Sequence, residues 1–221
     1  MVKILITGFR HSGTTMLHQL IKAHPQVGWI ENEESFIEFD KPKEWVLMHA
    51  SNRVPDLKKY AWGEKIPWAT RDNDLNGERA IEMIKKWLKY FKGQGRVLHI
   101  LRHPIDVALS GRSGAIKIEE KDWKYIMSSV PKVIDFINSN KRCKTIVYEE
   151  LLYEPEESIS QILDFLNLEN TPKIVKKIAT TPLKFGKINP ERAYNFKNKQ
   201  IETDFYYEGW LERVRNANIR T

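Results

Sequence analysis

The chain has 221 residues, a net charge of +7 and 41% hydrophobic residues, which suits one folded domain spanning residues 1–221. It lacks the roughly 20 consecutive apolar residues of a membrane span, and it lacks the apolar core of a signal peptide. Its single cysteine, Cys143, excludes an internal disulfide and a cysteine-based zinc cluster. We therefore expect a cytoplasmic protein with no membrane partner; its basic charge favours an anionic ligand, and no nucleic-acid-binding motif is visible.

The first predicted element is a strand, a glycine-bounded loop and a helix. Residues 3–7 form a short β-branched, apolar run typical of a buried parallel strand. A polar turn runs from Gly8 to Gly13, and apolar residues then recur at helical spacing. Because backbone N–H groups at a helix N-terminus attract anions, and glycines let the backbone approach closely, this segment predicts a phosphate cradle.

The loop nearly matches the Walker A pattern. Gly8 and Gly13 have its glycine spacing and Thr15 has its Ser/Thr position, but Thr14 replaces the lysine that reaches the β- and γ-phosphates of ATP. We therefore expect a bound phosphate without the usual ATP chemistry. A glycine turn with no ligand is the alternative.

Residues 10–15, R-H-S-G-T-T, resemble the 5′-phosphosulfate loop of sulfotransferases that use 3′-phosphoadenosine 5′-phosphosulfate (PAPS) and release 3′,5′-adenosine bisphosphate (PAP). The resemblance implies that this loop binds the 5′-phosphate of PAPS, through Ser12, Gly13, Thr14 and Thr15. In that family a Lys or Arg directly precedes S-G-T-T. Here His11 has that position and Arg10 comes one residue earlier, so both are candidates for stabilising the leaving phosphate.

An acidic segment, residues 31–40, follows a predicted short strand over residues 27–30. On composition alone it reads equally as a charged surface turn. The order of these sequence elements, however, resembles that in glycan sulfotransferases of the heparan type, where a strand is followed by E-N-E and a Phe-containing segment. The resemblance implies that Glu33 is the catalytic base, with Glu31 and Glu34 as alternatives. Sulfuryl transfer to a hydroxyl needs such a carboxylate to accept the proton.

Residues 41–76 are predicted to be irregular. Within them, E-K-I-P resembles an E-K-T-P element of the same family, with Ile66 replacing the usual Thr. The resemblance implies that Lys65 points into the active site, where it would stabilise charge that develops on the sulfuryl group. The alternative is a surface lysine on a proline turn.

A second phosphate motif follows a predicted helix over residues 77–91 and a predicted buried strand over residues 96–101. Residues 102–110 match the R-x-P-x-D-x-x-x-S motif of the family in every defining position. The resemblance implies that Arg102 and Ser110 bind the 3′-phosphate of PAPS. A planar guanidinium and a hydroxyl are suitable donors for a phosphate.

The second half of the chain completes the alternation of strands and helices. We predict a helix over residues 122–140, kinked or broken near Pro131, a strand over 144–148, and helices from Pro155, over 173–179 and over 206–211. Residues 148–168 resemble a structural segment of the family. Sulfotransferases also place a late basic loop over the 3′-phosphate, which makes Lys187 and Arg192 candidates, although the sequence favours an exposed loop here.

The sequence therefore predicts a three-layer, P-loop-like α/β domain with a mainly parallel central sheet flanked by helices. The resemblance implies a PAPS-dependent sulfotransferase that acts without a metal on an acceptor hydroxyl, with a carbohydrate favoured. A nucleotide or small-molecule kinase and an inactive nucleotide- or polyanion-binding module are the alternatives. Nothing in the sequence identifies the acceptor further or sets the oligomeric state.

Overall fold

The computed structural model describes residues 1–32, 43–54, 56–68, 77–109, 120–184 and 186–192. Its centre is a five-stranded sheet in the order β2-β3-β1-β4-β5, and every pair of neighbouring strands is parallel. The strands are β1 (Lys3–Phe9), β2 (Val27–Asn32), β3 (Ala61–Trp68), β4 (Gly95–Leu101) and β5 (Cys143–Val147).

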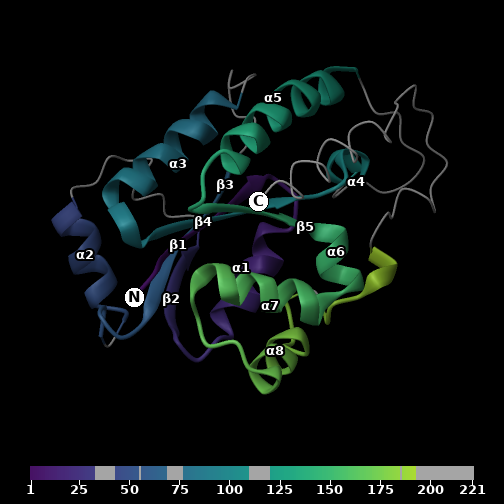
Figure 1. The fold of residues 1–221 in the computed structure, drawn as a ribbon. Coiled ribbons are helices and arrows are strands. Elements are labelled where there is room, and N and C mark those ends of the chain that lie inside the picture. Colours follow the sequence, from purple (N-terminus) through teal and green to yellow (C-terminus); the bar gives the residue numbers. More distant parts are fainter. Residues whose placement is uncertain (33–42, 55, 69–76, 110–119, 185, 193–221) are drawn as a thin grey trace.

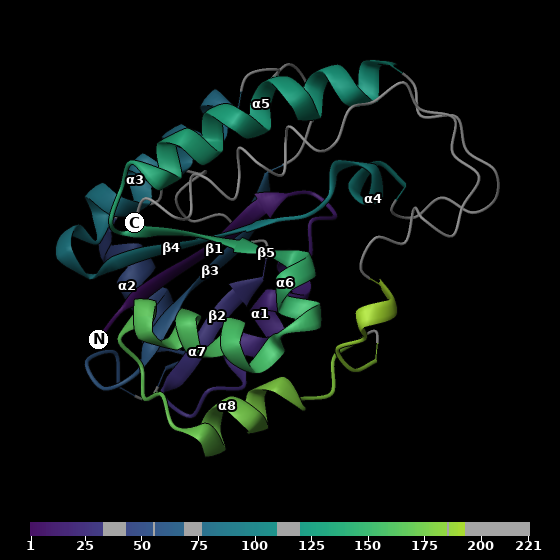
Figure 2. The same ribbon diagram turned by 45° about the vertical axis from the view of Figure 1, so that its right-hand side comes forward.

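Helices cover both faces of this sheet, which gives three layers (Figures 1 and 2). One face is covered by α2 (Lys43–Ser51), α3 (Glu78–Tyr90) and α5 (Glu120–Asn138). The other is covered by α1 (Thr14–Lys22), α6 (Tyr148–Tyr153), α7 (Pro155–Leu166) and α8 (Pro172–Ala179). The remaining elements are α4 (Pro104–Leu109) and two 3-10 turns, η1 (Lys92–Gln94) and η2 (Pro190–Arg192). The predicted fold class is confirmed.

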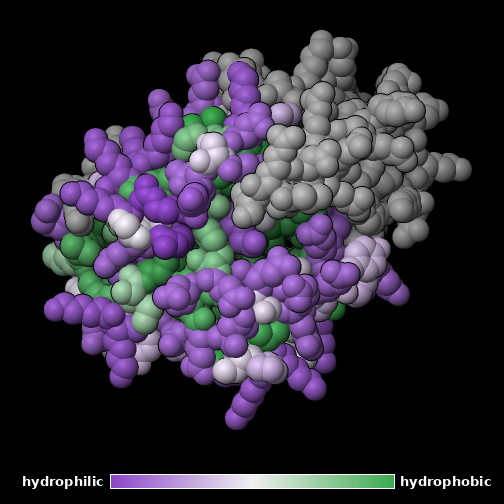
Figure 3. Space-filling model, in the orientation of Figure 1, coloured by the Kyte–Doolittle hydropathy of each residue, from purple (hydrophilic) through white to green (hydrophobic). Residues whose placement is uncertain are grey.

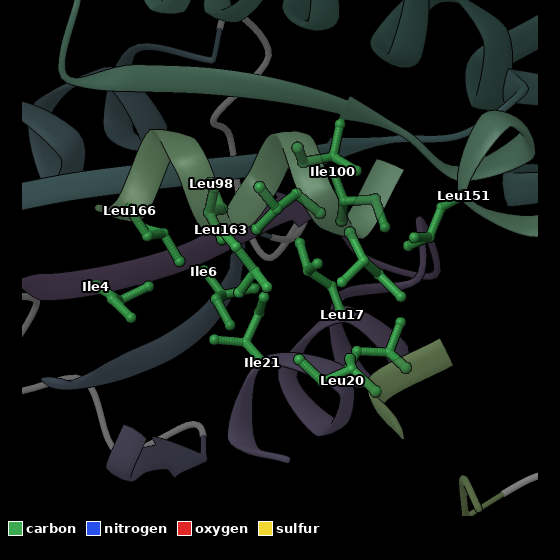
Figure 4. Packing of buried hydrophobic residues seen from close by; sticks show 14 of the residues in the cluster. Ile4, Ile6, Leu17, Leu20, Ile21, Leu98, Ile100, Leu151, Leu163 and Leu166 are labelled. Carbon is green, nitrogen blue, oxygen red and sulfur yellow. The ribbon is translucent and has the colours of Figure 1, made fainter. Parts of the chain in front are cut away.

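The core consists of two apolar layers, one on each face of β1. Ile4 and Ile6 point toward α1 and α7, whereas Leu5 points toward α2, α3 and α5. Figure 4 shows the first layer, where Leu17 and Leu20 of α1 meet the strands. Each of these side chains is fully buried, a change worth about 1.5–3 kcal/mol per residue. Packing on both faces explains why the first strand is a continuous apolar run.

One prediction about regular structure was wrong. Residues 41–76 were expected to be irregular, but they contain α2 and the strand β3. Residues 122–140 were expected to be kinked or broken near Pro131; α5 is one helix that includes this proline, so there is no break, and the kink stays a prediction. The predicted final helix over residues 206–211 lies outside the described residues.

The described surface is mainly polar on the face seen in Figure 3. Among the described residues, the exposed large apolar side chains are those of Met1, Met48 and Tyr153. No helix in the described ranges has both the length and the apolar character needed to cross a membrane.

Parallel pairing brings the carboxyl ends of all five strands to one edge of the sheet. Three junctions at this edge contain predicted or candidate residues: β1 to α1, β4 to α4 and β5 to α6. β1 is the middle strand, so its loop lies between the ends of β3 and β4. In such sheets, ligands bind outside the carboxyl ends of the strands.

Candidate functional site

The loop between β1 and α1 is tightly folded. The Ser12 N–H donates to the Phe9 carbonyl at 3.0 Å, and His11 and Gly13 have positive φ angles of 70° and 104°. Gly13 is the N-cap of α1 and has no side chain to cap the first turn. The Ser12 hydroxyl is buried and has no hydrogen-bond partner among the described residues. This loop therefore offers a polar hydroxyl and a helix N-terminus to an anion.

Two features exclude a side chain at position 13: the positive φ angle of Gly13 and a neighbouring residue that lies close to it. A methyl group at this position would lie 2.5 Å from Cδ2 of Tyr148, the first residue of α6. The Tyr148 ring thus packs directly against the start of α1. The end of β5 therefore supports the predicted phosphate loop, a relationship that the sequence motifs did not predict.

Arg102 joins the second predicted motif to the first. Its Nη1 donates to the His11 carbonyl at 3.2 Å, and its guanidinium lies 4.6 Å from the centroid of the Tyr148 ring. Its Nη2 is 3.9 Å from the Asp106 carboxylate, one turn further along the chain. Arg102 is thereby fixed beside the β1–α1 loop by a backbone contact, a ring and a charge.

Lys65 reaches the same loop from β3. It pairs with Ile6 of β1 and with Asn32 of β2, and it is almost completely buried. Its Nζ donates to Thr15 Oγ1 at 3.3 Å. The alternative interpretation of Lys65 as a surface lysine on a proline turn was therefore wrong. A neighbouring strand supplies the cation that is absent at Thr14, the position of the Walker A lysine.

His11 is not equivalent to the Lys or Arg that precedes S-G-T-T in the resembling family. Burial lowers the pKa of His11, and the positive charges of Arg10 and Arg102 lower it further. At neutral pH its imidazole is therefore neutral. Arg10 is exposed at the edge of the loop.

The two C-terminal candidates differ in their position. Arg192 lies in η2, which packs against α6, and its charge acts on Tyr148. Burial raises the pKa of Tyr148, while the charges of Arg102 and Arg192 oppose that rise. Lys187 is exposed.

Two predicted residues, Glu33 and Ser110, lie outside the described residues. Glu33 directly follows Asn32, the last residue of β2 and the partner of Lys65 in the sheet. Ser110 directly follows Leu109, the last residue of α4. Their roles stay predictions.

One buried carboxylate beside this cluster was not singled out by the motifs. Glu149, in α6, accepts a hydrogen bond at Oε1 from the His103 N–H at 2.9 Å. Burial raises the pKa of Glu149 to about 7, while the His103 hydrogen bond and the Arg102 charge oppose the rise. The available signal was its position, because Glu149 directly follows the predicted strand over residues 144–148 and hence lies at the same edge of the sheet.

Comparisons with known proteins agree with this arrangement. In structure, the chain is similar to a sulfotransferase domain from the curacin biosynthetic pathway, with a TM-score of 0.61 and 14% identity over 99% of this chain and 96% of that one. It is also similar to the sulfotransferase domain of the Synechococcus PCC 7002 olefin synthase, with a TM-score of 0.58 and 13% identity over 100% of this chain and 94% of that one. A mouse sulfotransferase, SULT7A1, complexed with PAP, has a TM-score of 0.50 and 18% identity over 80% of this chain and 63% of its own.

These structural similarities establish the fold. No individual curated protein matches the chain in sequence. The family model described as "Sulfotransferase domain" matches residues 2–209, and the chain therefore belongs to the sulfotransferase family.

Proposed function

We propose that this protein transfers a sulfuryl group from PAPS to an acceptor hydroxyl. The main support is the hydrogen bond from Arg102 to the His11 carbonyl, which joins the two phosphate motifs at one edge of the sheet. A donor with both a 5′-phosphosulfate and a 3′-phosphate needs two such anion sites close together. Family membership and the PAP complex of the similar mouse enzyme favour the same donor.

The described residues fit this donor. The 5′-phosphate would be held at the start of α1 by the backbone N–H groups and hydroxyls of Thr14 and Thr15. Ser12 would contribute its unpaired hydroxyl rather than its N–H, because the N–H already donates to Phe9. Gly13 would allow close approach of the phosphate.

The 3′-phosphate would be bound by Arg102 and Ser110. A guanidinium can make two parallel hydrogen bonds to a phosphate, and the Tyr148 ring lies 4.6 Å from that of Arg102. We also propose Arg192 and Lys187 as ligands of the 3′-phosphate. Arg192 lies beside α6 and Tyr148, and Lys187 belongs to the same basic segment.

PAPS supplies a sulfuryl group that is already activated by its bond to a phosphate. In the proposed reaction, Glu33 accepts the proton of the acceptor hydroxyl as its oxygen attacks. Lys65 and Arg10 supply positive charge for the sulfuryl oxygens and the departing phosphate oxygen, and neutral His11 donates a hydrogen bond. Because fixed side-chain cations provide this stabilisation, the proposal requires no metal ion.

We extend the proposal to a carbohydrate hydroxyl as the acceptor. The support is the E-N-E sequence at residues 31–33 and the E-K-I-P sequence at residues 64–67, both similar to glycan sulfotransferases. Residues 36–76 and 111–125 would line the acceptor site. A tyrosine side chain, a lipid head group and a small metabolite are the competing acceptors to include in an assay.

The kinase alternative has less support. Thr14 has the position of the phosphate-binding lysine, and β4 is followed by Arg102 rather than by the acidic residue that would hold Mg²⁺. The alternative of an inactive binding module would retain PAP affinity without transfer to any acceptor.

The proposal is tested by calorimetric binding of PAP without metal, beside Mg-ATP. We expect tighter binding of PAP, and loss of that preference in Arg102→Ala. Arg96→Ala is the matched control, because Arg96 lies near the opposite end of the same strand and binds the Gly93 and Gly95 carbonyls. Tight Mg-ATP binding that ignores the 3′-phosphate would overturn the sulfotransferase donor assignment and favour the kinase.

A further inference from the structure

The turn that contains Arg102 is held in place from a different helix. Glu149 of α6 accepts the His103 N–H at 2.9 Å, and His103 Nδ1 in turn accepts the Ile105 N–H at 3.1 Å. Both side chains are almost completely buried, with 4% exposure for Glu149 and 1% for His103. The backbone directly after Arg102 is therefore fixed by a carboxylate that is 46 residues away in the sequence.

The side chain of Arg102 is supported by the same helix. Tyr148, the residue before Glu149, lies under the Arg102 guanidinium. α6 thus holds the backbone beside Arg102 through Glu149 and the guanidinium itself through Tyr148. Both contacts arise where β5 ends and α6 begins.

We propose that Glu149 is a positioning residue for donor binding, which fixes Arg102 for the 3′-phosphate through the hydrogen bond it accepts from His103. This inference rests on the proposed PAPS donor. It assigns a role to a carboxylate that does not itself touch the donor. A carboxylate or amide oxygen can accept this hydrogen bond, whereas a methyl group would leave the buried His103 N–H unsatisfied.

Glu149 is also close to several other charges. Arg102 and Asp106 face it from the β4–α4 region, with His103 in direct contact, and η2 brings Arg192 toward neighbouring Tyr148. Its raised pKa of about 7 means that it gains a negative charge as pH rises through neutrality. That charge would compete with the 3′-phosphate for Arg102, so donor affinity should decrease as Glu149 ionises.

The test compares PAP with 5′-AMP, which lacks the 3′-phosphate, by calorimetry at pH 7. We expect wild-type protein to prefer PAP and Glu149→Ala to lose at least about tenfold of that preference, while its 5′-AMP affinity changes little. Glu149→Gln should keep the preference within about threefold, because its amide oxygen still accepts the His103 N–H. The control is Glu150→Ala, which changes an exposed glutamate of the same helix.

The outcomes separate this inference from the function on which it rests. If wild-type protein shows no preference for PAP, the donor assignment fails, and this inference fails with it. If wild-type protein prefers PAP and Glu149→Ala keeps that preference, or loses PAP and 5′-AMP affinity equally, only the inference is overturned.

A second variant covers the case in which Glu149→Ala does not fold. Glu149→Leu fills a similar volume but has no acceptor for the buried His103 N–H, so we expect the same loss of preference for PAP over 5′-AMP. A folded Glu149→Leu variant that keeps this preference would overturn the inference. The competition by the Glu149 charge is measured separately, as a PAP to 5′-AMP affinity ratio that falls by about threefold more between pH 6 and pH 8 in wild-type protein than in Glu149→Gln.

Discussion

Lys65 and Thr15 are 50 residues apart in the sequence, yet Lys65 Nζ donates to Thr15 Oγ1 at 3.3 Å. The contact places a buried cation from β3 at the start of α1, beside the predicted phosphate loop. In Walker A proteins that cation comes from the loop itself. Here the sheet order β3-β1 delivers it from the adjacent strand.

We expect Lys65→Met to reduce turnover by about 10²- to 10³-fold, because the variant keeps the length of the side chain but removes a charge that stabilises the transition state. Binding of PAP should change much less, since PAP lacks the sulfuryl group. Turnover is measured as PAP released from PAPS with a monosaccharide acceptor, and binding by calorimetry.

Lys3→Met is the matched control for this variant. Lys3 is also buried, but it lies near the amino end of β1 and donates to the Leu57 carbonyl at 3.1 Å, away from the carboxyl edge of the sheet. It should retain wild-type turnover. Equal losses in the two lysine variants would show that Lys65 acts through stability rather than through catalysis.

Glu33→Gln should reduce turnover by about 10²- to 10⁴-fold, the usual contribution of a general base, while leaving PAP affinity nearly intact. The control is Glu44→Gln, which changes an exposed glutamate in the first turn of α2. Turnover of Glu33→Gln at a near wild-type rate would exclude Glu33 as the base. Glu31→Gln and Glu34→Gln would then be measured in the same way.

The sequence predicted the strands that are apolar on both faces. β1 and β4 were found because each contains mostly aliphatic residues on both faces, which is typical of parallel strands covered by helices on both sides. The two predicted phosphate motifs were recognised by their resemblance to a known family, and each contains residue types that can bind anions. Their contact through Arg102 and the His11 carbonyl depends on sheet order, which the sequence does not state.

β3 was missed because its composition is unusual for a buried strand. It contains Glu64 and Lys65, both almost completely buried, and Gly63, at which a side chain would overlap the Ile4 carbonyl. Charges, glycine and proline within eight residues indicate a loop by local propensity. Tertiary contacts outweigh that propensity here, since β3 lies between β1 and β2.

Gly13→Ala should destabilise the protein and abolish PAP binding. The left-handed backbone at Gly13 costs a non-glycine residue about 1–2 kcal/mol, and a methyl group 2.5 Å from Tyr148 adds roughly 1–3 kcal/mol of overpacking. Urea unfolding and PAP calorimetry measure the two effects.

Gly186→Ala is the control for Gly13→Ala, because Gly186 has a similar φ of 102° but no atom of the described residues within 4 Å of an added methyl group. Gly186→Ala should lose only the free energy of unfolding that comes from the left-handed backbone, without the overpacking cost. If both variants lose the same stability and both bind PAP, the packing of Tyr148 against the loop has no role in forming the phosphate site.

His99 should make the fold sensitive to acid. It is 1% exposed in β4, between Thr7 of β1 and Thr145 of β5, and burial lowers its pKa to about 4. Since His99 binds a proton near pH 6.5 in the unfolded chain but only near pH 4 in the folded one, the unfolded state binds more protons between these values. Its contribution to the free energy of unfolding is therefore complete above pH 6.5 and decreases as pH falls toward 4, by up to about 3 kcal/mol.

The measurement is urea unfolding of wild-type protein and His99→Gln at pH 7, 5.5 and 4.5. Because Gln does not titrate, we expect the stability difference between the two proteins to shift in favour of the variant as pH decreases. Glu149 and the other carboxylates titrate in both proteins, so their effects cancel in that difference. A difference that stays constant with pH would mean that His99 is protonated in the folded state as readily as in the unfolded chain, and that its burial does not limit stability in acid.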